Sequence, residues 1–263
     1  MRHFTMQDLE TALRMADAAR AAILPLFRSS NVEAENKAST GFDPVTVADR
    51  AAEKAMRDIL AETCPEDGIL GEEFGAQNGP SGRTWVLDPI DGTRGFISGT
   101  PTWGVLIALS DTDGPGLGVI DQPYIGERFW GFDGRAECIG PLGTTVLRTR
   151  ATDSLDQAIL FTTFPEVGTP QDRAGFQSVS AKVRLTRYGM DCYAYALVAA
   201  GQADLVIEAG LQPYDIQAPI AVIEAAGGVV TDWEGRPVHQ GGRVLAAANS
   251  ALHEKALDVL HSA

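Results

Sequence analysis

The apolar run Trp85–Leu87 is followed by two aspartates, Asp88 and Asp91, that stand three residues apart. Pro89 fixes its own φ and favours extended geometry at Asp88, so we expect an abrupt turn at a strand end that points both carboxylates at one locus. Two carboxylates about 4 Å apart repel each other by about 4 kcal/mol at an effective dielectric constant of about 20. Such a pair needs a proton or a cation.

The residues that follow this pair suit an anion. Gly92 lets the backbone approach a ligand closely, and the N–H groups of Gly92 and Thr93 can donate hydrogen bonds to that ligand. A turn with solvated aspartates is the simpler interpretation of a bare Asp-Pro-x-Asp sequence. The complete run from Trp85 to Thr93 is far more specific, and it favours a binding site.

Other acidic positions can reach the same place. Glu72 and Glu73 follow the short apolar run Ile69–Leu70, and two neighbouring strand ends would deliver carboxylates to one edge of a sheet. We expect one of these two glutamates to be exposed. Asp215 stands at the expected N-terminus of a helix, where a capping role is common and a phosphate is favoured, so both roles can hold together.

Histidine and cysteine are few and scattered. The chain has four histidines, near its two ends, and three widely spaced cysteines: His3, His239, His253 and His261, with Cys64, Cys138 and Cys192. This argues against a disulfide framework, a zinc centre built on thiolates or histidines, and a Ser-His-Asp triad. A bound metal would therefore have mainly oxygen ligands, which suit Mg²⁺, Mn²⁺ or Ca²⁺.

The composition is typical of a soluble globular protein. The 263 residues are 44% hydrophobic and 21% charged, and their formal net charge of −14 repels nucleic acid and anionic membranes. No apolar run approaches the roughly 20 residues of a membrane span, and the N-terminus lacks the apolar stretch of a secretory signal. We therefore expect a cytoplasmic protein without nucleic-acid or membrane partners.

Periodicity predicts the elements that must position these residues. Thr5 and Asp8 form an acidic capping box for a first helix, which Pro25 should kink or end. A second helix should begin near Thr46 and stop at residues 65–68.

Short strands and helices follow along the chain. We expect strands at 69–70, 85–87, 105–109, 117–120, 128–132, 159–163, 205–207, 229–231 and 244–247, and helices at 191–200, 215–226 and 250–260. The first half is β-rich and the second half alternates, which predicts layered α+β and α/β lobes rather than a simple doubly wound sheet. We place the boundary between the lobes near residues 140–153.

Four motifs resemble the inositol monophosphatase superfamily in order and spacing: Asp43-Pro44-Val45-Thr46, Gly71–Glu73, Trp85–Thr93 and Glu208–Asp215. The resemblance implies an α/β (α+β) fold, a layered αβαβα sandwich, in a single phosphatase domain with one lobe at about 1–145 and a second at about 146–263. It also implies a homodimer that hydrolyses a small-molecule phosphate monoester with two or three Mg²⁺ ions.

The resemblance implies a role for each matching residue. The metal ligands would be Glu72, Asp88, the Ile90 carbonyl, Asp91 and Asp215. Asp43 and Thr93 would orient the attacking water, with Glu72 as a further catalytic residue. The substrate would contact Asp91, Gly92, Thr93, Arg187, Asp191, Glu208 and Asp215.

Within the superfamily, the chain looks like the histidinol-phosphatase branch, through the runs Asp88–Phe96, Tyr188–Tyr195 and Leu211–Asp215. Inositol-specific members usually have Thr-Asn in place of Arg94-Gly95, a small residue at Asp191 and Trp at Tyr214. The branch implies hydrolysis of L-histidinol phosphate to L-histidinol and phosphate, a step of histidine biosynthesis.

Charge favours the same substrate. Histidinol phosphate carries an ammonium and an imidazole, and Asp191 and Glu208 could offer them negative partners. Arg187 could bind the phosphate or orient Asp215, although an internal ion pair between Arg187 and Glu208 is an equally good interpretation.

Rival functions remain open. Inositol-1-phosphatase and nucleotide 3′-phosphatase activities belong to the same superfamily, and a non-catalytic metal- or phosphate-binding regulatory protein is an alternative of another class. The run Asp111–Gly114 superficially resembles a haloacid-dehalogenase motif, but Pro115 follows it and a hairpin turn explains it better. The chain has no Gly-x-x-x-x-Gly-Lys-[Ser/Thr] motif, which excludes a P-loop enzyme.

We predict that Asp88→Asn or Asp91→Asn abolishes turnover without unfolding the protein, because each change removes a carboxylate but keeps its size. Phosphate release and circular dichroism of the two variants check this. A variant that keeps its activity would remove that residue from the site.

Overall fold

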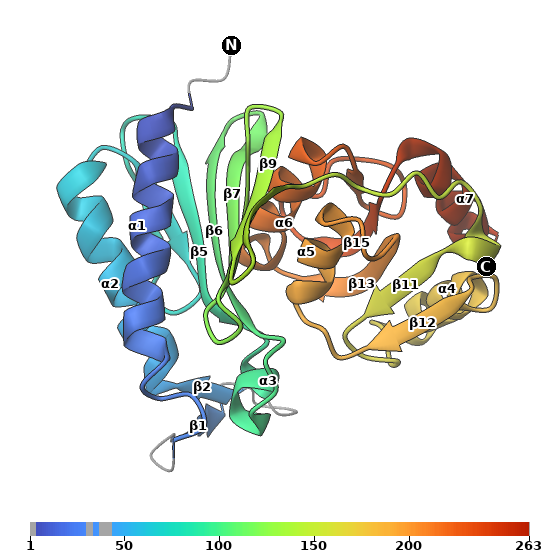
Figure 1. The fold of residues 1–263 in the computed structure, drawn as a ribbon, viewed down its shortest axis with the longest axis horizontal. Coiled ribbons are helices and arrows are strands. Elements are labelled where there is room, and N and C mark those ends of the chain that lie inside the picture. The colour runs from blue at the N-terminus through green and yellow to red at the C-terminus, as the bar shows by residue number, and fades with distance from the viewer. Residues whose placement is uncertain (1–3, 30–33, 37–43, 263) are drawn as a thin grey trace.

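The computed structural model describes residues 4–29, 34–36 and 44–262, and Figure 1 shows its stacked layers. Two N-terminal helices cover one face of a large sheet. A middle layer of helices separates this sheet from a smaller one, and two further helices pack on the far side of the smaller sheet. The predicted αβαβα sandwich is confirmed. The division into lobes near residue 145 stays a prediction.

Helices α1 (Met6–Ile23) and α2 (Val47–Thr63) form the first layer. The capping box predicted for α1 is confirmed: the Asp8 N–H donates to Thr5 Oγ1 (3.2 Å), and the Thr5 N–H donates to the Asp8 carboxylate (2.7 Å). The helix ends two residues before Pro25, which cannot continue the pattern of backbone hydrogen bonds.

The large sheet has eight strands within the described residues, in the order β10-β9-β8-β7-β6-β5-β3-β4. The strands are β3 (Gly68–Gly71), β4 (Gly75–Gln77), β5 (Thr84–Asp91), β6 (Gly104–Asp111), β7 (Gly114–Gln122), β8 (Glu127–Phe132), β9 (Arg135–Gly140) and β10 (Gly143–Val146). The sequence missed β4, β9 and β10, because these strands at the sheet margins contain no continuous apolar run.

Strands β3 and β5 are parallel neighbours, so their carboxyl ends lie at one edge of the sheet and bring Glu72 and Asp88 there, as the sequence predicted. The predicted abrupt turn at Asp88 is wrong, because β5 continues through Asp91. Its pairing with β6 is irregular between Asp88 and Asp91. Pro89 has no N–H for the ladder, which accounts for a bulge at this point.

Helices α5 (Tyr193–Ala199) and α6 (Pro213–Ala225) form the middle layer. A Cβ atom at Gly118 in β7 would lie 2.4 Å, and one at Gly131 in β8 would lie 2.5 Å, from carbonyl oxygens of α6. The two glycines therefore let α6 lie directly on the sheet. This contact fixes the depth at which α6 places its first turn.

The second sheet has five strands within the described residues, in the order β12-β11-β13-β15-β14. The strands are β11 (Ile159–Thr162), β12 (Leu185–Tyr188), β13 (Leu205–Leu211), β14 (Val229–Thr231) and β15 (Gly242–Ala247). The outer helices are α4 (Pro170–Ser180) and α7 (Ser250–His261), and Asn249 caps α7. The sequence missed α4 and β12, which are polar or exposed along much of their length.

Short elements complete the fold. They are the pair β1 (Ala34–Asn36) and β2 (Pro44–Thr46), helix α3 (Thr93–Ser98) and the 3₁₀ turn η1 (Leu155–Gln157). Among the helices of the described part of the chain, we find none with the length and apolarity that a membrane crossing requires.

We predict that Gly118→Ala destabilises the protein by about 1–3 kcal/mol, because the new methyl group must push α6 away from the sheet. Urea unfolding measures the change. Gly175→Ala in α4 is the matched control, since its Cβ would meet only side-chain atoms, at 3.4 Å, and alanine favours a helix. Equal stability of the Gly118 variant and the wild type would contradict the close packing.

Candidate active site

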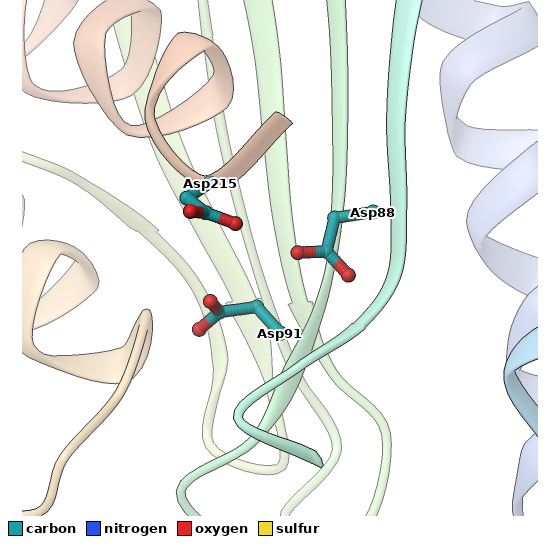
Figure 2. A group of neighbouring side chains, drawn as sticks. All are labelled: Asp88, Asp91 and Asp215. Carbon is teal, nitrogen blue, oxygen red and sulfur yellow. The ribbon is translucent and has the colours of Figure 1, made fainter. Parts of the chain in front are cut away.

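Three aspartates from two distant segments meet between the two sheets. Figure 2 shows Asp88 and Asp91, from β5, and Asp215, from α6, with their carboxylates turned toward one another. One oxygen of each carboxylate can be chosen so that the three atoms lie within 4.8 Å of one another. The structure thus brings together three of the acidic residues that the sequence singled out.

Asp88 is the most deeply buried member of the cluster, with 2% of its surface exposed. Its Oδ1 atom has no hydrogen-bond partner among the described residues. Burial raises the pKa of Asp88 well above its usual value, and the negative charges of Glu72 and Asp91 raise it further. A buried oxygen without a donor costs about 1–3 kcal/mol, so this position requires a proton or a cation.

Asp91 and Asp215 are each fixed by a backbone donor. The Cys192 N–H donates to Asp91 Oδ2 (2.6 Å), while burial and the charge of Asp215 raise the pKa of Asp91 well above its usual value. The Gln212 N–H donates to Asp215 Oδ2 (2.7 Å) in a capping box. Asp215 is therefore the third residue of α6, since the helix begins two residues earlier than predicted, at Pro213.

The cluster lines a cavity of about 370 Å³. Further predicted site residues on its wall are Glu72, Ile90, Gly92, Thr93, Asp191 and Glu208. Glu166 adds another carboxylate, and Arg94 is the one cationic side chain among the described residues of the wall. The arrangement therefore attracts positively charged groups.

Glu208 lies at the wall of this cavity and accepts three hydrogen bonds. Thr163 donates its backbone N–H (2.9 Å) and its hydroxyl (2.6 Å), and the Tyr195 hydroxyl donates at 3.3 Å. Burial raises the pKa of Glu208 to about 7, although the bonds from Thr163 act in the opposite direction. Glu208 therefore changes its charge near neutral pH.

Asp191 joins the segment around α3 to the start of α5. Its φ of 45° is unusual for a residue with a side chain, and the Thr102 hydroxyl donates to its Oδ2 atom (2.9 Å). A Cβ atom at Gly92 would lie 2.7 Å from the Asp191 Cγ atom. With a φ of 82°, Gly92 is thus required both by its conformation and by this contact.

The model of the inositol monophosphatase family matches residues 5–263 of the chain. The chain belongs to the inositol monophosphatase family.

Three similar proteins illustrate this relationship. The chain is 41% identical over 257 residues to the bifunctional phosphatase IMPL2, chloroplastic, of Arabidopsis thaliana, covering 94% of this chain and 72% of the relative. It is 34% identical over 245 residues to the histidinol-phosphatase of Chlorobaculum parvum, covering 93% of each. A solved inositol monophosphatase structure from Zymomonas mobilis matches with a TM-score of 0.86 and 41% identity, covering 99% of this chain and 100% of that one.

These findings establish the reaction class of this family member. Its relatives are phosphatases, so the chain is a phosphoric monoester hydrolase. These relatives include both a histidinol-phosphatase and an inositol monophosphatase, so the relationship alone does not decide the substrate.

Two residues predicted for the site are not found on the cavity wall. Asp43 lies outside the described residues. Arg187 is exposed on β12, at the margin of the second sheet, and is not among the described lining residues. Within the described chain no ion pair joins it to Glu208, whose carboxylate is held by neutral donors instead. The ion pair with Glu208 is therefore not found among the described residues, and the roles of Arg187 in binding the phosphate or orienting Asp215 stay predictions.

The sequence also gave a wrong expectation for the glutamate pair. Neither Glu72 nor Glu73 is exposed. The Glu73 side chain is 2% exposed and forms an ion pair with Arg50 of α2 (3.7 Å).

Sequence reasoning missed three residues that shape this site. Asp49 of α2 is 1% exposed, and its charge is among those that raise the pKa of Asp88. Its place on the buried face of α2, in register with Ala52 and Met56, was a signal that could have identified it. Thr163 and Tyr195 had no such signal, because only the folded chain shows that they donate to Glu208.

The acidic cluster fits a divalent metal ion. Its donor atoms are carboxylate oxygens, which hard cations prefer, and the partnerless Asp88 Oδ1 atom is an available ligand. Asp88, Asp91 and Asp215 are the residues that would hold the ion.

We predict that Asp88→Asn stabilises the metal-free protein against urea at pH 7, because the variant removes a buried carboxylate that burial and its acidic neighbours destabilise. Folding raises the pKa of Asp88, so the folded state binds more protons than the unfolded state. Stability from this group is therefore fully present below its unfolded pKa of about 4 and is lost as the pH rises toward the folded value.

Urea unfolding in EDTA at pH 7 and at pH 4 measures this effect. The gain from Asp88→Asn should shrink at pH 4, where the aspartate is itself protonated, and should reverse when a divalent ion is added. A loss of stability in EDTA at pH 7 would contradict the repulsion between these carboxylates.

Proposed function

We propose that this phosphatase catalyses the Mg²⁺-dependent hydrolysis of a phosphate monoester with positively charged groups, and that this ester is L-histidinol phosphate. The observation that carries the proposal is the charge of the cavity. Seven of its described lining residues are acidic, against the single cation Arg94: Glu72, Asp88, Asp91, Glu166, Asp191, Glu208 and Asp215.

Some of these acidic residues would be metal ligands. We propose that Asp88, Asp91 and Asp215, together with Glu72 and the Ile90 carbonyl, hold two or three Mg²⁺ ions. Bound Mg²⁺ would neutralise phosphate charge and lower the pKa of water. The supporting features are the mutual proximity of the three aspartates and the unsatisfied Asp88 Oδ1 atom.

The chain itself must then orient the water and the phosphate. The Thr93 hydroxyl donates to the Ile90 carbonyl (3.2 Å), which fixes its position beside the cluster. We propose that Thr93 orients the water and that Gly92 lets the phosphate approach the backbone. The part assigned to Asp43 stays a prediction. Asp49 suits the same role, because it is buried near the start of α2 and its charge acts on Asp88.

The acidic residues that are not metal ligands would favour a substrate whose leaving group is positively charged. Asp191, which directly precedes the N-cap of α5, and Glu208 of β13 both line the cavity. An ammonium and an imidazolium placed there would be attracted by both carboxylates, whereas an inositol ring offers only neutral hydroxyls. A cationic substrate would also keep Glu208 ionised, by lowering its pKa from about 7.

Inositol 1-phosphate is the second candidate. It is favoured by the 41% identity to the Zymomonas mobilis inositol monophosphatase. The acidic residue at position 191 argues for histidinol phosphate, since its negative charge would attract a cationic substrate more strongly than the neutral hydroxyls of inositol.

The proposed substrate also suggests a pathway for the enzyme. We propose that it acts in histidine biosynthesis, as a cytoplasmic homodimer. Size-exclusion chromatography with light scattering would test the dimer.

We predict that histidinol phosphate gives the highest kcat/KM in a parallel assay with inositol 1-phosphate and adenosine 3′,5′-bisphosphate, and that EDTA abolishes turnover of all three. A higher kcat/KM for either of the others would refute the substrate. Turnover that persists in EDTA would refute the metal requirement.

Asp191→Asn is the matched variant for this assay, because it removes one charge and keeps the size of the side chain. It should raise KM for histidinol phosphate by about tenfold, the equivalent of about 1.4 kcal/mol of lost attraction, and change KM for inositol 1-phosphate much less. Equal effects on both substrates would show that Asp191 has only a structural role.

A further inference from the structure

Residues on one face of helix α2 form hydrogen bonds and an ion pair with the loop that follows β3. Arg50, Glu53 and Arg57 stand three and four residues apart, so they lie on the same side of the helix. Each contacts the backbone or a side chain of residues 73–75. This loop begins with Glu72, which lines the acidic cavity.

Glu53 is the centre of these contacts. Its side chain is fully buried, and its Oε2 atom accepts the N–H of Glu73 (2.7 Å). Its Oε1 atom accepts the N–H of Phe74 (3.2 Å) and the Nε–H of Arg57 (2.8 Å). One carboxylate therefore binds two successive backbone amides of the loop.

Arg57 supports the same loop from the neighbouring turn of α2. Its guanidinium donates to the Gly75 carbonyl (2.5 Å) and lies 5.9 Å from the centre of the Phe74 ring. It also neutralises Glu53, which makes a buried carboxylate tolerable at this position.

Gly71 provides the space that Glu53 needs. A Cβ atom at Gly71 would lie 2.0 Å from Glu53 Oε1, closer than any real contact. The last residue of β3 is thus shaped to receive this carboxylate. On the other side of the loop, the Glu72 N–H donates to the Leu87 carbonyl of β5 (3.2 Å).

We propose that Glu53 is a positioning residue that fixes the Glu72 carboxylate for metal binding. The Glu72 backbone is anchored to β5 at its own N–H, and Glu53 anchors the next two N–H groups, so the backbone at Glu72 and the direction of its Cα–Cβ bond are fixed. Glu53 does not itself line the cavity within the described residues. The inference rests on the proposed metal site, in which Glu72 is a ligand.

Glu53→Gln tests this inference, because it keeps the size of the side chain but replaces one accepting oxygen by an NH₂ group. Calorimetric titration of the EDTA-treated, dialysed protein with Mg²⁺ measures the affinity. We expect the Mg²⁺ Kd to rise by about tenfold, as is typical when a partner that orients a metal ligand is lost. The increase in Tm on adding Mg²⁺ should shrink accordingly.

Lys54→Ala is the matched control. It removes another i,i+4 ion pair of α2, with Asp58, whose side chains are exposed to solvent. The Mg²⁺ Kd of this variant should equal that of the wild type. Gly71→Ala is a second, independent variant that displaces Glu53 without changing its charge, and it should also weaken Mg²⁺ binding.

The outcomes separate the inference from the proposed function. The inference is overturned if the wild type binds Mg²⁺ and Glu72→Gln weakens this binding, but Glu53→Gln leaves the Mg²⁺ Kd unchanged and only lowers Tm in EDTA. Glu53 would then have a purely structural role. If Glu72→Gln itself leaves the Kd unchanged, or the wild type binds no Mg²⁺, the proposed metal site is refuted and the inference with it.

Discussion

The mutual repulsion of buried carboxylates is the constraint on which this structure depends. Asp88, Asp91 and Asp215 place oxygen atoms within 4.8 Å of one another, and at such a separation each pair repels by a few kcal/mol at an effective dielectric constant of about 20. Burial and these neighbouring charges raise the pKa of Asp88 and Asp91 in the same direction. The fold must hold together three carboxylates that would otherwise move apart, so a bound cation would relieve their repulsion.

Apolar packing outside the site keeps the three aspartates together. The parallel pair β3 and β5 fixes one edge of the large sheet, and its core packs under α1 and α2. Helix α6 is seated on Gly118 and Gly131 and carries Asp215 in its first turn. Because both supports belong to apolar cores, the cluster can be electrostatically unfavourable without the metal and still remain assembled.

Much of this arrangement could be predicted from the sequence. The strand that carries Asp88, the acidic residue after β3 and the capping box of Thr5 and Asp8 depend on local spacing, and the structure confirms all three. The predicted turn at Asp88 was wrong because a strand can absorb a proline through an irregular register. Likewise, Asp215 is not the first residue of its helix, because Pro213 can begin it.

Other features depend on contacts that no local pattern contains. The exposure of Arg187 follows from the marginal place of β12 in the second sheet, and strand order cannot be deduced from a short run of residues. The neutral donors on Glu208 come from β13's neighbours in space, at Thr163 and Tyr195. Asp49 is the exception, since its place on the buried face of α2 could have identified it.

The central claim is that a divalent ion joins the three aspartates. Crystals grown in EDTA and soaked in Mn²⁺, which binds oxygen ligands as Mg²⁺ does and scatters anomalously, test it most directly. The account predicts an anomalous peak between the carboxylates of Asp88, Asp91 and Asp215, with the Asp88 Oδ1 atom as a ligand. A map without that peak, in crystals where the three side chains point apart, would contradict it.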